Sequence, residues 1–264
     1  MCKAICGVGA GACNGAINVH WSRGSDISDI NAKFGAQHTV TGSLGLIFAA
    51  FFAKSVNNLP LNILWFLYSL LTALHVFANM MCLKLVAFDY FNTERLTMVV
   101  ESFLERIRRG EDSGKIFVEE PIMVSSQEAL LFGISRRIPI HMGVSFNSLV
   151  RSSDMDEEEI KDAIGDISNK KYTVTLGTNR SIYVAMNEDS DNTDKTKAYF
   201  HGLILRKLIE SDDSIRNGKV LKDAVEEVVN KLWPYFHASA INGHWDLSKT
   251  ELTTKGYGIS IPSS

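Results

Sequence analysis

Cysteine is scarce in this sequence and absent from most of it. The four cysteines are Cys2, Cys6, Cys13 and Cys82, so residues 83–264 contain none. A secreted protein held together by disulfides is therefore unexpected. Cys2 and Cys6 would share one helix face, but no second cysteine or histidine pair follows at zinc spacing. We expect no metal site, and we interpret the thiols as small apolar packing residues.

Charged side chains are almost missing from the first 93 residues. That stretch contains five lysines or arginines and three aspartates, whereas the remainder contains 22 basic and 27 acidic side chains. Segments that face lipid have the first composition, and solvated domains have the second. The N-terminal segment also lacks a basic leader ahead of a leucine-rich core, so no cleavable signal peptide is expected.

A long apolar run extends from Leu59 to about Phe91 and is sufficient to cross a bilayer. Within it lie four polar side chains at helical spacing, which we call the polar stripe: Tyr68, Thr72, His75 and Asn79. On a helix they line one side of an apolar cylinder, which is costly in hydrocarbon unless they face protein or water. The stripe predicts either hydrogen bonds between neighbouring helices or a pathway for a substrate or proton.

Small residues mark the segment 3–21. Its glycines recur every fourth residue, at Gly7, Gly11 and Gly15. This spacing lets two membrane helices approach closely, so we expect packing against another helix, with a glycine-rich loop as the alternative. A dinucleotide-binding motif is excluded because too few residues precede Gly7 to form its strand.

These patterns predict an α-helical membrane segment followed by a soluble α+β domain. The membrane segment covers residues 1–110, with helices near 3–21, 40–56 and 60–109 and a polar break at 22–38. Pro60 suits the first turn of the third helix. The soluble domain covers residues 111–264.

Alternation and amphipathic periodicity define the expected elements of the soluble domain. Apolar and polar side chains alternate over 138–146, and Pro139 places that strand at a sheet edge. Residues 172–176 and 182–186 flank a turn and predict a hairpin. Helices are expected after a capping pair at Asp154 and Glu157, and over 194–211 and 218–238.

Several residues could carry chemistry, and each has a simpler interpretation. The acidic loop 187–194 lacks the glycine and the bidentate glutamate of a calcium loop, which favours a turn that caps the next helix. His201, His237 and His244 have no recognisable nucleophile nearby, so packing or surface roles are favoured. Trp245 and Asp246 are expected to form an aromatic anchor and a turn.

One basic cluster follows the long apolar run. Arg106, Arg108 and Arg109 lie among acidic residues, namely Glu101, Glu105 and Glu111. This mixture indicates a solvated helix end or a contact with anionic lipid, and it is not typical of a nucleic-acid interface.

The succession of motifs resembles the root UVB sensitive family. In order they are KAICGVGAGA, NAKFGAQHTV, HVFANMMCLKLVAFDYFNTERL, AYFHGLIL and NGHWDL. The resemblance implies a membrane-associated protein of a family that has no established enzymatic activity or catalytic residue. It also implies links to ultraviolet B responses, vitamin B6 balance and auxin transport in plants. The family's recurring positions that match here are His20, Lys33, Gly35, Gln37, His75, Asn79, Asn92, Arg95, Tyr199, His201, Trp245 and Asp246.

The chain departs from the family pattern in two places. Cys13 and Asn14 stand where a Thr-Arg pair is usual, and His38 stands where an acidic residue is usual. The family domain usually begins upstream of a segment like KAICG, so we expect this chain to be the downstream portion of that domain.

The resulting hypothesis is a multi-pass membrane protein that is not an enzyme. It would act through partner binding or through homeostasis or transport of a small molecule related to vitamin B6 or a hormone. Its expected partners are membrane lipid and a protein partner or second copy, without nucleic acid, and no cofactor is expected. A plastid is the expected organelle if the source is a plant. The alternative is an enzyme whose pocket lies between the helical bundle and the soluble domain.

Overall fold

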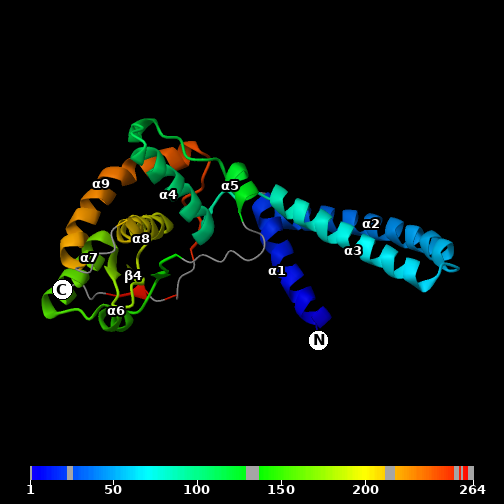
Figure 1. Ribbon diagram of the computed structural model, residues 1–264, viewed down its shortest axis with the longest axis horizontal. Helices are drawn as coiled ribbons and strands as arrows, with labels where there is room; N and C mark the ends of the chain where they lie inside the picture. The colour runs from blue at the N-terminus through cyan, green and yellow to red at the C-terminus, as the bar shows by residue number, and fades with distance from the viewer. Residues whose placement is uncertain are drawn as a thin grey trace. The chain divides into compact units, whose positions relative to one another are not determined.

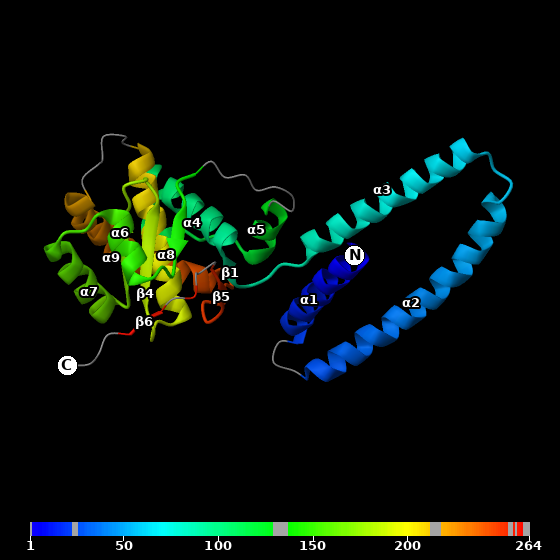
Figure 2. The same ribbon diagram turned by 90° about the horizontal axis from the view of Figure 1, so that it is seen from below.

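The structure is a computed structural model, and it describes residues 2–22, 26–128, 137–211, 218–252, 256 and 258–260. The chain divides into two compact units, Met1–Val86 and Ala87–Ser264. Figures 1 and 2 show a first unit built from helices alone and a second unit in which helices surround a small sheet. The predicted order, apolar helices followed by a domain of helices and strands, is confirmed.

The first unit contains α1 (Cys2–Ser22), α2 (Ile27–Val56) and α3 (Leu61–Leu85). The predicted polar break at 22–38 is wrong over most of its length, because α2 already begins at Ile27. The Asp26 carboxylate caps its first turn by accepting a hydrogen bond from the Ser28 amide. Lys33 pairs with Asp29 one turn earlier, at 2.7 Å, so charged residues are accommodated within the helix.

Two helices of the described chain, α2 and α3, are long and apolar enough to cross a membrane. At a rise of about 1.5 Å per residue they measure roughly 45 Å and 38 Å, which exceeds the hydrocarbon thickness of about 30 Å. They are joined by a tight turn in which the Leu59 amide donates to the Val56 carbonyl, and Pro60 precedes α3 as predicted. No residue of either helix is buried.

The predicted continuous helix over 60–109 is two helices. α3 ends at Leu85, Val86 is extended, and the chain then forms β1 (Phe91–Asn92) before α4 (Thr93–Arg108). Asn92 fixes the start of the second helix, because its side chain accepts a hydrogen bond from the Arg95 amide as the N-cap of α4. Phe91 is fully buried in the second unit. The unit boundary therefore lies at Val86 and not at the predicted residue 110.

The described residues of the second unit form six α-helices, namely α4 and five that follow it. Those five are α5 (Pro121–Gln127), α6 (Phe146–Ser153), α7 (Glu157–Lys170), α8 (Asn192–Ser211) and α9 (Gly218–Asn242), with a 3-10 turn at Ser113–Lys115. The cap of α7 is Asp156, whose side chain forms a capping box with Glu159. The predicted pair at Asp154 and Glu157 lies two residues too early. Asp154 instead ends α6 in the left-handed conformation.

The sheet is mixed and centred on β4 (Ile182–Asn187). Its neighbours are β3 (Tyr172–Leu176), antiparallel, and β2 (Ile140–Met142), parallel, while β6 (Gly258–Ile259) pairs with the end of β4. The predicted hairpin is confirmed with Val174 opposite Val184. The strand predicted over 138–146 covers only Ile140–Met142. It directly follows Pro139 and lies at an edge of the sheet, as expected. β1 pairs separately with β5 (Thr250–Glu251).

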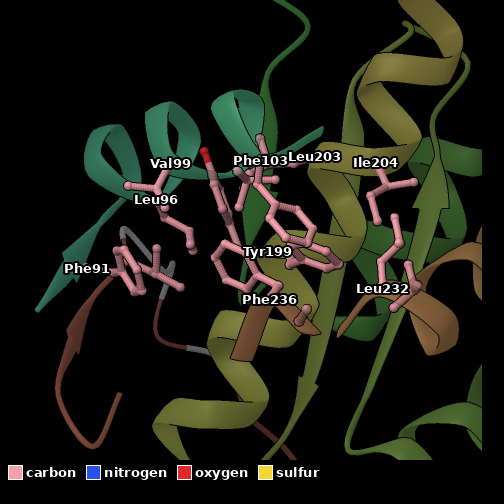
Figure 3. Close-up of a cluster of buried hydrophobic side chains, with 14 of the residues drawn as sticks. Phe91, Leu96, Val99, Phe103, Tyr199, Leu203, Ile204, Leu232 and Phe236 are labelled. Carbon is pink, nitrogen blue, oxygen red and sulfur yellow. The ribbon is translucent and has the colours of Figure 1, made fainter. Parts of the chain in front are cut away.

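Alternation along β4 divides the core between the two faces of the sheet. Ile182, Val184 and Met186 join the larger cluster with α4, α8 and α9, whereas Tyr183 and Ala185 join the smaller cluster with α6 and α7. The larger cluster is built around aromatic rings, among them Phe103 and Phe236 (Figure 3), and the ring of Phe200 stacks on that of Phe236 at 4.9 Å between centroids. This layered arrangement fixes the positions of the polar side chains described next.

Candidate functional site

The polar stripe lies along α3 with all four side chains exposed. His75 Nε2 and Asn79 Nδ2 are 3.0 Å apart, so the structure joins these two side chains by a hydrogen bond. The Thr72 hydroxyl donates to the Tyr68 carbonyl at 2.8 Å. The stripe thus satisfies part of its own hydrogen bonding within one helix, which lowers the cost of placing it in hydrocarbon.

The glycines of α1 present an open surface. Gly11 and Gly15 are exposed, and a Cβ atom added at either position would meet no atom within 4 Å. Gly7 lies in α1, but its surroundings fall outside the described side chains. Packing of these glycines against another helix stays a prediction.

A polar pocket of about 200 Å³ in the second unit was not predicted. Three helices each contribute two polar residues four positions apart: Asp166 and Lys170 from α7, Lys197 and His201 from α8, Glu226 and Asn230 from α9. Residues at this spacing point the same way, so each pair faces the pocket from its own helix. β3 supplies the remaining lining residues with Val229: Tyr172, Thr173 and Val174.

Lys170 forms the electrostatic centre of this pocket. Its ammonium lies 2.9 Å from an Asp166 oxygen and 2.5 Å from a Glu226 oxygen. Burial lowers the pKa of Lys170, but the hydrogen bonds that its ammonium donates to both carboxylates outweigh burial and leave the pKa above its ordinary value. The Lys170 amine is therefore held protonated, which makes it a poor nucleophile.

Tyr172 and His201 close one side of the pocket. Their rings meet edge to face at 5.8 Å between centroids, and both residues are buried. Burial, followed by the charges of Glu226 and Asp166, raises the pKa of Tyr172 far above its ordinary value. The phenol thus stays neutral. The pocket can hold a polar molecule beside a protonated Lys170 amine and a neutral Tyr172 phenol.

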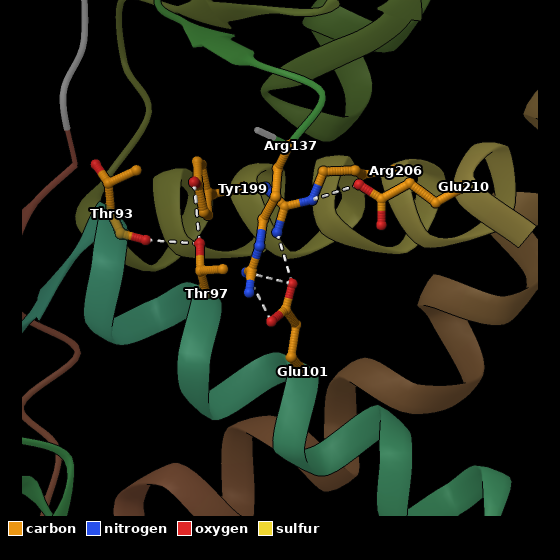
Figure 4. Close-up of polar contacts among 7 residues, drawn as sticks. All are labelled: Thr93, Thr97, Glu101, Arg137, Tyr199, Arg206 and Glu210. Carbon is orange, nitrogen blue, oxygen red and sulfur yellow. Dashed lines mark hydrogen bonds and ion pairs between the residues drawn. The ribbon is translucent and has the colours of Figure 1, made fainter. Parts of the chain in front are cut away.

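A second polar cluster joins α4 to α8 (Figure 4). Glu101 accepts hydrogen bonds from Arg137 at 2.6 Å and from the buried Arg206 at 2.9 Å. One turn earlier on α4, the Thr97 hydroxyl lies 3.2 Å from the Tyr199 hydroxyl. These contacts align the two helices across the core, so we assign the cluster a structural role.

The acidic loop, Trp245 and Asp246 form the contacts that their simpler interpretations predicted. Asp191 and Asp194 exchange hydrogen bonds between side chains and amides at the start of α8, as a capping turn does. The described residues contain no group of three potential metal ligands. Trp245 is buried, and its indole donates to the Glu119 carbonyl at 2.9 Å, while Asp246 accepts from the Ser248 amide.

The arginines of the basic cluster at the end of α4 form ion pairs with neighbouring glutamates. Arg106 pairs with Glu111 at 2.7 Å, and Arg108 and Arg109 both pair with Glu105. All of these groups are at least partly exposed. They therefore form an exposed helix end, and both interpretations of the sequence, a solvated end and a contact with anionic lipid, stay predictions.

Comparison with known proteins matches nearly the whole chain. A family model described as "Vitamin B6 photo-protection and homoeostasis domain" matches residues 1–107, and one described as "Root UVB sensitive protein, C-terminal" matches residues 118–257. The first match therefore extends past the unit boundary and through most of α4. No solved structure matches the chain.

Two curated relatives show the same similarity. Protein root UVB sensitive 3 from Arabidopsis thaliana is 26% identical over 225 residues, which cover 81% of this chain and 48% of that protein. RUS family member 1 from Dictyostelium discoideum is 26% identical over 152 residues, covering 57% of this chain and 27% of that protein. The chain thus aligns with less than half of each relative's length.

Proposed function

The chain belongs to the root UVB sensitive family, and from this premise we propose that it is a membrane-inserted component of small-molecule homeostasis. The description of the N-terminal family model supports vitamin B6 as the related metabolite. The proposed protein crosses the membrane more than once. It acts by binding a protein partner or second copy, or by moving a small molecule.

The exposed apolar surface of α2 and α3 carries this proposal. Large side chains point outward along both helices, and none is covered by the first unit: Phe48, Phe51, Phe52, Trp65, Phe66 and Phe77. Contiguous exposed apolar surface of this extent marks a membrane or protein contact. Lipid fits best because both helices are long enough to span the hydrocarbon layer.

A non-enzymatic role is supported by two observations. The family is not a known enzyme family. In the second unit, the amine of Lys170 is held protonated and the phenol of Tyr172 neutral, so neither is prepared for nucleophilic or base chemistry. The polar stripe on α3 then provides the polar contact of the membrane segment, either to a neighbouring helix or to a passing molecule.

Thiol accessibility tests membrane insertion. In full-length protein whose natural cysteines are replaced by serine, one cysteine is placed at Leu71 in the middle of α3 and another, separately, at Lys161 on exposed α7. The protein is reconstituted in vesicles that are opened by freezing and thawing. Maleimide should modify position 161 at once and position 71 only after detergent is added. Equal modification of both positions without detergent would overturn the proposal.

An enzyme is the second candidate, and the polar pocket is the observation that favours it. Its volume of about 200 Å³ suits a small metabolite. Thermal shifts with pyridoxal phosphate and related small metabolites would detect a ligand, and product formation from that ligand would then separate catalysis from binding. Turnover that is lost in Lys170→Met would replace the non-enzymatic proposal.

A further inference from the structure

The second unit exposes three large apolar side chains on and before α5. Phe117, Ile122 and Met123 are 67%, 58% and 55% exposed, the highest values for large apolar side chains that the structure describes in this unit. We call these three residues the α5 patch. The opposite side of α5 packs inward through Val124, which is buried. α5 is therefore a short amphipathic helix whose outer side is apolar where a solvated helix would be polar.

The end of α5 is fastened to the place where the chain enters the second unit. Glu128, directly after α5, accepts hydrogen bonds from Asn92 and Arg95, each at 2.9 Å. The Arg95 guanidinium in turn lies over the rings of Phe88 and Tyr90, 5.2 Å and 5.9 Å from their centroids. Met123 precedes Glu128 by five residues, a helical rise of only about 8 Å.

Chain length limits how far this region can lie from a bilayer. Six residues lie between Leu85, the end of α3, and Asn92, and the resulting seven steps of fully extended chain span at most about 24 Å. If α3 crosses the membrane, as proposed above, Leu85 is near the lipid headgroups. This connection contains Tyr90, and tyrosine is enriched at membrane interfaces.

The charged residues near the α5 patch do not attract it to anionic lipid. Arg106 donates a hydrogen bond to the Phe117 carbonyl at 2.7 Å, but it is paired with Glu111, and Glu119 and Glu120 lie between Phe117 and α5. Arg106 is thus matched by Glu111, and the two further glutamates leave the rim of the patch acidic, so anionic lipid offers it no electrostatic attraction. Contact with a membrane would rest on the apolar side chains and would not require anionic lipid.

We propose that the α5 patch inserts into the interface of the bilayer that α2 and α3 enter, and so holds the second unit against the membrane surface. The proposal rests on the membrane insertion proposed above. It assigns α5 as a monotopic anchor beside the spanning helices, with Phe117, Ile122 and Met123 as the residues that enter the lipid.

Lipid quenching tests the anchor in the full-length protein. An environment-sensitive fluorophore is attached to a single cysteine at Met123, or separately at Lys161 or Leu71, in the cysteine-free background. In both Figures 1 and 2, α7 with Lys161 is at the other end of the second unit from α5. The protein is reconstituted in phosphatidylcholine vesicles that carry a nitroxide close to the headgroup. Position 123 should be quenched several-fold more than position 161, and adding phosphatidylserine should change neither.

Each other outcome overturns the anchor in a recognisable way. If position 71 is protected and position 123 is quenched only by aqueous iodide, the helices are inserted but the patch is in water. If position 123 is quenched by neither agent, a second copy or another protein covers the patch. If position 71 is itself reached by iodide, membrane insertion fails and the anchor fails with it.

Discussion

The indole of Trp245 stacks on the ring of Phe91, with centroids 4.2 Å apart and planes inclined by 17°. Phe91 is the first fully buried residue after the connection from α3, and Trp245 follows α9 near the other end of the unit's sequence. The stack therefore joins the start of the second unit to its C-terminal part. Both residues belong to motifs that carry the family resemblance.

Removing the indole should destabilise the second unit strongly. Trp245→Ala leaves a cavity against Phe91 and removes the hydrogen bond to the Glu119 carbonyl, so its free energy of unfolding should fall by about 3–5 kcal/mol. Denaturant unfolding of the full-length protein in detergent micelles measures this. Trp21→Ala, at an exposed indole of α1, is the matched control and should leave the transition in place. Equal effects of the two variants would contradict the anchor role.

Glu101 and Glu105 lie one turn apart on α4 and should differ sharply in their contribution to stability. Glu101→Gln leaves the buried guanidinium of Arg206 without its closest carboxylate and should cost about 2 kcal/mol. Glu105→Gln removes only exposed pairs with Arg108 and Arg109, which water and salt screen. Its unfolding transition should match that of the wild type. Similar costs for both variants, measured by denaturant unfolding of the full chain, would refute the structural role of the Arg206 cluster.

The sequence predicted elements that depend on local pattern. The hairpin of β3 and β4 was correct because alternation along 182–186 reflects burial on two faces of one sheet. The helix over 60–109 was wrong because its apolar run continues up to Phe91, whereas α3 ends at Leu85 and a separate helix begins after the N-cap Asn92. The periodicity of apolar residues does not reveal such a cap, because the cap is a hydrogen bond of one polar side chain. Phe91 is apolar for a different reason from α3, since it fills the core of the second unit.

The candidate sites show the same difference between features that follow from local sequence and features that depend on distant residues. The polar stripe was visible because its residues lie on one helix. The structure adds a hydrogen bond between His75 and Asn79, while the role of the stripe stays a prediction. The pocket was missed because Lys170 and Glu226 come from helices distant in sequence. The signal that could have revealed it was the repeated spacing of four between polar residues on three amphipathic helices. That pattern predicts a common polar pocket only if the three helices are already known to lie next to one another.

The pocket should make the second unit sensitive to alkali. The folded pKa values of Lys170 and Tyr172 are both raised above their ordinary values, and their unfolded values are about 10.4 and 10. Their protonated forms thus stabilise the folded state below about pH 10, and this stabilisation is lost as pH rises toward the folded pKa values. The unfolding free energy of the wild type should fall more steeply above that pH than that of the Lys170→Met, Tyr172→Phe double variant. Parallel curves would show that the pocket does not couple to folding.

The last prediction concerns the polar stripe and depends on what His75 and Asn79 face. If they line a polar pathway, His75→Leu should abolish function in cells that lack their own family member, because Leu suits lipid but offers no polar contact. Val76→Leu, one residue along on another side of α3, is the matched control and should keep function.

A hydrogen bond that only joins helices predicts a different result. His75→Leu would then cost about 0.6 kcal/mol and spare function whenever the protein accumulates normally. The comparison must be made at equal protein level in the membrane, because a less stable protein is degraded and its loss imitates lost activity. Full rescue by His75→Leu at equal abundance would remove the polar stripe from the mechanism. The polar pocket and the partner surfaces would then be left to carry the function.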